Sequence, residues 1–80
     1  MASNWISVKK RLPTEDDIQR NFGKNLFLVT AVFGEKEHLQ KTVYITSFNI
    51  DLNVWEAYEG NIVTHWGYLP FPAIIEPDKI

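Results

Sequence analysis

The 80-residue sequence contains no cysteine. Disulfide bonds and cysteine-ligated zinc, which stabilise many small domains, are therefore excluded. A chain of this length buries only about 60–65% of the surface that its unfolded form exposes. The sequence has three Trp, three Tyr and five Phe, and each buried aromatic removes about 150–250 Å² from water. We therefore expect one domain, residues 1–80, stabilised mainly by aromatic packing, with residues 67–80 as a proline-rich C-terminal tail.

Concentrated positive charge and long apolar runs are also lacking. Eight Lys and Arg stand against ten Asp and Glu, for a net charge of -2, and residues 9–11 form the only basic run. Binding to phosphates through counterion release needs concentrated positive charge, so we expect no direct nucleic-acid ligand. No apolar stretch approaches the about 20 residues of a membrane span, and the N-terminus lacks the apolar core of a signal peptide. A soluble cytoplasmic protein without a membrane partner is predicted.

Catalytic and metal-binding motifs are absent from the sequence. A zinc site needs at least three protein ligands, and His38 and His65 form no recognisable ligand spacing with the scattered carboxylates. We interpret His38 as a turn residue and His65 as a packed or rim residue. Asp16 and Asp17 are neighbours at a predicted helix start, where negative charge stabilises the helix end without any catalytic role. No serine lies in a nucleophile motif and no phosphate-binding loop is present. The sequence predicts no enzymatic activity, no metal and no cofactor.

A short helix is predicted over residues 14–22. Thr14 can cap free backbone N–H groups at its start, and the acidic residues that follow favour the positive helix end. Ile18 and Phe22 are four positions apart and would share one face. Gly23 suits the left-handed conformation that ends a helix.

The remaining pattern predicts antiparallel strands. Residues 26–33 are apolar without alternation, which is typical of a strand covered on both faces. A polar turn at residues 34–38 and a β-rich run at residues 39–49 complete a hairpin. Shorter strands are expected at residues 4–8, 54–58 and 62–66, and the four prolines at positions 13, 70, 72 and 77 avoid all of these strands. We predict an α+β fold: a small antiparallel β-meander of three to four strands with one short helix at residues 14–22.

The predicted strand at residues 26–33 raises the question of what covers the sheet. A helix of two turns covers only part of one face. The other face must therefore meet the C-terminal tail, a second subunit or a target protein.

The aromatic residues allow two interpretations. They either form the core, because buried area is scarce in a small domain, or line a platform for a planar ligand such as a nucleotide base. The core interpretation is favoured for the three tryptophans. Residues 68–72 favour extended or polyproline II geometry and could cover the sheet or act as a docking surface. The candidate binding surface comprises Trp55, Tyr58, His65, Trp66, Tyr68 and Phe71.

The two ends of the chain resemble a known family. Residues 5–13, W-I-S-V-K-K-R-L-P, resemble the opening W-I-S-V-x-x-R-L-P of the domain-of-unknown-function family 551. Residues 63–72, V-T-H-W-G-Y-L-P-F-P, are similar to its closing V-T-H-W-M-P-L-P-x-P. Gly67 and Tyr68 replace the usual Met-Pro, and the residues from 14 to 24 are more polar and helix-like than in many relatives. The resemblance spans nearly the whole chain, but only the T-H-W-x-x-L-P end and the W-I-S-V start are specific.

The resemblance implies an origin rather than a chemistry. Members of family 551 are typically small proteins of bacteriophages and prophages with no assigned activity, so no catalytic residue can be carried over. The shared end motifs also suggest that Trp5 and Trp66 pack near one another and close the first and last segments into one core.

We therefore predict a small phage-type, non-enzymatic binding protein that inhibits a host defence or regulatory protein by direct protein–protein binding. Surface acids at positions 35, 37, 56 and 59 would engage a basic surface of that host protein. The alternative is a homo-oligomer that binds or sequesters a nucleotide-like small ligand with its aromatics and His65.

Overall fold

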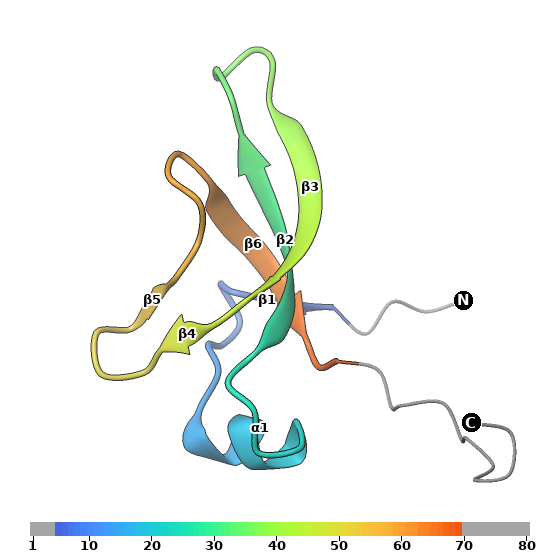
Figure 1. Cartoon of the computed structure of the whole chain (residues 1–80). Coiled ribbons are helices and arrows are strands. Elements are labelled where there is room, and N and C mark those ends of the chain that lie inside the picture. Colours follow the sequence, from blue (N-terminus) through green and yellow to red (C-terminus); the bar gives the residue numbers. More distant parts are fainter. Residues whose placement is uncertain (1–4, 70–80) are drawn as a thin grey trace, which may run out of the picture.

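The computed structural model describes residues 5–69, which form an antiparallel sheet and one short helix (Figure 1). The four-stranded sheet has the order β1-β6-β2-β3, and a second, two-stranded sheet pairs β4 with β5. Among these residues, no helix is long and apolar enough to span a membrane. The elements in chain order are β1 (Ile6–Ser7), α1 (Glu15–Arg20), β2 (Phe27–Phe33), β3 (Gln40–Thr46), β4 (Phe48–Asn49), β5 (Val54–Trp55) and β6 (Ile62–Gly67).

The predicted antiparallel sheet of up to four strands is confirmed, but the predicted meander order is wrong. In a meander each strand pairs with the next, whereas here β6 lies between β1 and β2. Only β2 and β3 form a sequential hairpin within the main sheet. Ile6 pairs with Trp66, which joins the first strand to the last and supports the predicted closure of the chain ends. The register partner of Trp66 is Ile6 rather than Trp5, whose exposed fraction is 37%.

The prediction that both faces of residues 26–33 are covered is also wrong for the part of the chain that the structure describes. Burial alternates along β2: Phe27, Val29 and Ala31 are buried, and the residues between them are only half-buried. Leu26 precedes the strand and is 42% exposed. The apolar residues on the second face therefore mark a surface that the described residues leave uncovered.

The core lies on the inner face of the sheet. It consists of five buried residues, which are Phe27, Val29, Ala31, Val63 and Trp66. The rings of Phe27 and Trp66 meet edge to face with centroids 5.4 Å apart, an arrangement that aromatic quadrupoles favour. Side chains from the helix and from the β5 segment pack against this cluster, so both elements cover the inner face.

The helix begins where the sequence predicts and ends earlier than predicted. Thr14 is the N-cap, and its backbone N–H donates to the Asp17 carboxylate at 2.7 Å. Gly23 has a φ of +71°, which confirms it as the left-handed residue after the helix. Phe22 also lies in the left-handed region, at +62°, and therefore leaves the helix. The prediction that Ile18 and Phe22 share a helical face is wrong: Ile18 packs against the core, and Phe22 is 47% exposed.

The hairpin between β2 and β3 depends on Gly34. Its φ of +104° is one that residues with a side chain rarely adopt. A Cβ at this position would lie only 2.9 Å from the His38 backbone oxygen. Glycine is therefore required for this turn.

Asn21 connects the helix to the last strand and is fully buried. Its Nδ2 donates to the Lys24 carbonyl at 3.1 Å and to the Leu26 carbonyl. Its Oδ1 accepts the Leu69 N–H at 3.0 Å. One amide thus fixes the loop before β2 and the chain after β6.

We expect Asn21→Ala to lower the free energy of unfolding by about 1–3 kcal/mol, because it leaves one backbone N–H and two carbonyls without this partner. The matched control is Gln19→Ala on the exposed side of the helix, which should stay within about 0.5 kcal/mol of the wild type. Urea unfolding monitored by tryptophan fluorescence measures both variants. Equal midpoints for the two would show that the Asn21 amide contributes nothing.

Candidate functional site

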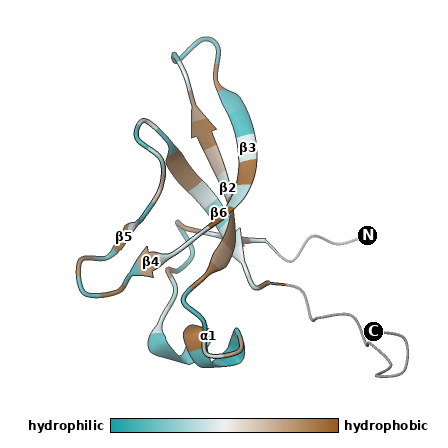
Figure 2. Cartoon of the chain, in the orientation of Figure 1, coloured by the Kyte–Doolittle hydropathy of each residue, from teal (hydrophilic) through white to brown (hydrophobic). Residues whose placement is uncertain are grey.

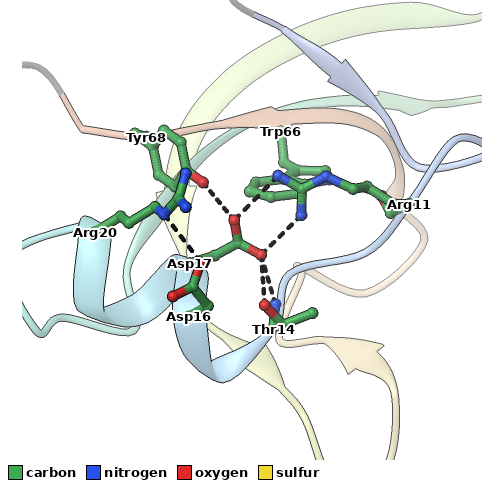
Figure 3. Close-up of polar contacts among 7 residues, drawn as sticks. All are labelled: Arg11, Thr14, Asp16, Asp17, Arg20, Trp66 and Tyr68. Atoms are coloured by element: carbon green, nitrogen blue, oxygen red, sulfur yellow. Dashed lines mark hydrogen bonds and ion pairs between the residues drawn. The ribbon is translucent and has the colours of Figure 1, made fainter.

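A buried carboxylate, Asp17, is the centre of the most extensive polar network in the described residues (Figure 3). The Arg11 guanidinium donates to both of its oxygens, at 2.8 and 3.1 Å. The backbone N–H and the hydroxyl of Thr14 donate to Oδ2, and the Tyr68 hydroxyl donates to Oδ1. The segment from Arg11 to Asp17 and the distant Tyr68 after β6 therefore meet at one side chain.

The network fixes the ionisation of its members. Burial by itself would raise the pKa of Asp17, but hydrogen bonds from Arg11, Tyr68 and Thr14 outweigh burial and hold that pKa well below its usual range. The hydrogen bond to Asp17 raises the pKa of Arg11. Burial and then the bond to Asp17 raise the pKa of Tyr68. A general acid or base works best with a pKa near the operating pH, so these shifts favour a structural role over proton transfer.

The Arg11 side chain also covers the core tryptophan. Its guanidinium carbon lies 5.0 Å from the centroid of the Trp66 ring, a cation–π distance. The Trp66 indole N–H donates to the backbone carbonyl of Arg11 at 3.0 Å. Arg11 belongs to the N-terminal motif and Trp66 to the C-terminal one, so the two end motifs meet in a structural contact (Figure 3).

Sequence reasoning missed the role of Asp17 and interpreted it only as a charge at a helix end. The signal that could have found it is the spacing Thr14-x-x-Asp17, which is close to a capping box. In a capping box the fourth residue reaches back to the N-cap N–H, as Asp17 does here. Nothing in the local pattern indicates the bonds to Arg11 and Tyr68.

In the structure, the residues of the predicted aromatic binding surface lie in different places. Trp66 is buried, Trp55 is half-buried with its ring 4.9 Å from that of Phe48, and Tyr68 packs against the same core. Tyr58 is 70% exposed and lies against Tyr44 with ring centroids 4.8 Å apart. His65 is exposed on the opposite face of the sheet, and Phe71 lies outside the described residues. The described members do not form one platform.

A second surface lies on the uncovered face of the main sheet, which we call the outer face. Directly paired residues of antiparallel strands point to the same side, so the ladder pairs define its members. Val43, Ile45 and Ile62 are 57%, 54% and 66% exposed. Figure 2 shows apolar stretches on β2, β3 and β6, the three strands that form this face. The outer face consists of Leu28, Thr30, Val32, Lys41, Val43, Ile45, Ile62 and His65.

Acidic residues cluster at one end of the outer face. Glu35 and Glu37 lie in the turn between β2 and β3, and Glu59 lies in the turn before β6. Val32 pairs with Ile62, so the two turns are at the same end of the sheet. All three glutamates are exposed. Two lysines lie at the same end, Lys36 in the same turn as Glu35 and Lys41 opposite Val32, so three Glu and two Lys give a net charge of -1 there. The glutamates of the two turns can pair with basic residues of a partner.

An open cleft of about 320 Å³ lies between the helix and β4. Three carboxylates line it, from Glu15, Asp51 and Glu56, and no Lys or Arg is among its lining residues. The other lining residues are Ile18, Asn25, Ser47, Phe48, Asn49 and Ile50. Such a cleft favours positively charged groups and repels phosphates.

Among residues 5–69, no three His, Asp or Glu side chains lie close enough to hold a metal ion. Comparisons with protein-family models, curated proteins and solved structures found no match for this chain. The resemblance of the end motifs to family 551 therefore stays a prediction from those motifs.

Proposed function

We propose that this chain is a non-enzymatic binding protein that inhibits a host defence or regulatory protein, and that it docks through the outer face of its sheet. The observation that carries the proposal is the exposure of Val43, Ile45 and Ile62 on a face that the described residues leave uncovered. Apolar area removed from water on docking contributes about 25 cal/mol per Å² before the costs of association are subtracted. An uncovered apolar sheet face is typical of an interaction site.

The charge around this face defines the kind of partner. The partner surface is apolar at its centre and basic on the side that meets Glu35, Glu37 and Glu59. Complementary potentials mainly accelerate association and fix orientation. Proteins that handle nucleic acids carry such basic surfaces, which agrees with a host defence or regulatory target.

The alternative, a nucleotide-like ligand, has less support from the geometry. Trp55, Trp66 and Tyr68 contribute to the core, so they are not available together for stacking on a base. The carboxylates of the cleft repel a phosphate group. The aromatic residues and the cleft thus both favour a protein partner.

The experiment compares two charge-matched variants in capture from a bacterial host lysate. Ile62→Arg places a charge on the outer face, and Leu52→Arg places the same charge on a residue of the β4–β5 turn that is 69% exposed. We expect the wild type and Leu52→Arg to retain the same protein, and Ile62→Arg to bind the purified partner at least about tenfold more weakly, the effect of losing one hot-spot contact. Equal binding by all three forms would overturn the proposal, as would failure of the wild type to retain any protein across several hosts.

A further inference from the structure

The backbone edge of β3 that points away from β2 has no strand partner among the described residues. β3 pairs with β2 over seven consecutive residues, without a bulge, and is the last strand of the sheet (Figure 1). Natural edge strands are usually protected by proline, bulges, charges or short length. The opposite edge is protected by length, since β1 has only two residues. β3 has no proline and a single charge, on Lys41.

The last residues of β3 are occupied by another contact. The Thr46 hydroxyl donates to the Glu56 carbonyl, and the Glu56 N–H donates to the Ser47 carbonyl at 2.9 Å. The edge available to a partner is therefore the segment from residue 40 to residue 45.

We propose that a second copy of this chain pairs with this edge, so that the two β3 strands run antiparallel about a two-fold axis at Val43. In this register Val43 faces Val43 of the second copy on the outer face, and Lys41 faces Ile45. On the inner face Thr42 faces Tyr44. Cross-strand pairs of β-branched and aromatic residues stabilise a sheet, and the lysine stem can lie along the isoleucine.

Charge selects this register over its neighbours. An axis at Lys41 would place two ammonium groups directly opposite one another, and an axis at Thr42 would leave them about 7 Å apart along the strand. An axis at Val43 separates them by about 13 Å, beyond the screening length of about 8 Å at physiological salt. An axis at Tyr44 would pair Lys41 with Ser47, which already bonds to Glu56. The edge is thus complementary to itself at Val43.

The pairing gives a continuous eight-stranded sheet, because each copy contributes four strands. The outer faces of the two copies then form one surface, with Val43 and Ile45 of both chains at its centre. This inference does not depend on the identity of any host partner. It uses the backbone edge, whereas docking of a host protein uses the side chains of the face.

The solution mass of the full chain tests the proposal. We expect the wild type to reach twice the chain mass of 9.3 kDa by multi-angle light scattering at concentrations up to about 1 mM, the weak end of specific association. Val43→Lys places like charges together at the axis and should be monomeric, while the charge-matched Leu52→Lys should remain dimeric. Val43 is 57% exposed in one chain, so the variant should fold. A monomeric wild type, or a dimeric Val43→Lys, would overturn the proposal.

Cysteine cross-linking tests the register, since the natural sequence has no cysteine. Directly opposite residues of an antiparallel pair have Cβ atoms about 4.5–5.5 Å apart, close to disulfide reach. Val43→Cys should therefore form a disulfide dimer under mild oxidation at least tenfold faster than Leu52→Cys. Equal rates for the two variants would rule out an axis at Val43. If the wild type forms the dimer but captures no host protein, the proposed function is contradicted and this inference still holds.

Discussion

Replacing Trp66 with alanine is expected to lower the free energy of unfolding by about 3–5 kcal/mol, the usual cost of truncating a buried aromatic side chain. Trp66 is fully buried, and its ring contacts those of Phe27 and Trp55. The variant also loses the indole hydrogen bond to the Arg11 carbonyl and the ring beneath the guanidinium. Small proteins have only about 5–15 kcal/mol in total, so we expect the urea midpoint to fall to a small fraction of its wild-type value.

Two further variants keep this prediction testable if Trp66→Ala does not fold. Trp66→Phe retains an aromatic ring but removes the indole donor, and should cost about 1–3 kcal/mol because the Arg11 carbonyl loses its partner. Leu52→Ala is the control, since its side chain is 69% exposed, and should change stability by less than about 0.5 kcal/mol. A Trp66→Ala midpoint close to that of Leu52→Ala would contradict the assigned core.

Asp17→Asn is expected to have the second large effect, a loss of about 1.5–3 kcal/mol at neutral pH, because the buried carboxylate loses its charge-assisted hydrogen bonds while the half-exposed Arg11 side chain can still be hydrated. The amide cannot accept from Arg11, Thr14 and Tyr68 as the carboxylate does. The matched control is Asp16→Asn, which removes an exposed pair with Arg20 at 2.9 Å. Exposed helical pairs of this kind contribute only about 0.3–0.5 kcal/mol.

The same two variants test how the free energy of unfolding depends on pH. The folded-state pKa of Asp17 lies below the unfolded value of about 3.9. The carboxylate therefore stabilises the fold above that value, and the stabilisation is lost as the pH falls below about 4 toward the folded-state pKa. Unfolding free energies measured between pH 7 and pH 2 should decline more steeply for the wild type and Asp16→Asn than for Asp17→Asn. Parallel curves for all three would show that Asp17 does not carry the acid sensitivity.

The local elements of this fold could be predicted because each depends on neighbouring residues. Thr14 and Gly23 mark the start of the helix and the turn after it through their own backbone preferences. The hairpin of β2 and β3 follows from two β-rich runs separated by a turn that requires Gly34. The last strand, predicted at residues 62–66, lies at Ile62–Gly67, whereas the strand predicted at residues 54–58 is shorter and ends at Trp55.

The sheet order could not be predicted because it depends on contacts between residues that are far apart in the chain. Ile6 and Trp66 are 60 positions apart in sequence, and nothing near either residue indicates the other. The uncovered face of β2 was missed for a related reason. An unbroken apolar run shows that burial of both strand faces would be favourable. It does not show whether anything covers them, because Leu28 and Val32 are equally apolar with or without a covering partner.

The candidate site was predicted only in part for the same physical reason. Aromatic residues suit both a core and a binding platform, so the sequence alone could not show that Trp66 and His65 lie on opposite sides of the sheet. The structure separates them by placing one on each side of the sheet. Asp17 has three side-chain partners, of which Arg11 and Thr14 are within six residues and only Tyr68 comes from a distant segment.

The pairing of the first strand with the last has a consequence for how the protein forms during synthesis. The partners of Ile6, Arg11 and Asp17 lie between residues 65 and 68. The nascent chain therefore cannot complete its core until residue 68 has been translated. Long-range closure of this kind raises contact order and slows folding. We expect emergence of residues 66–68 from the ribosome, rather than growth of an N-terminal nucleus, to set the moment at which the described core becomes protected from proteases.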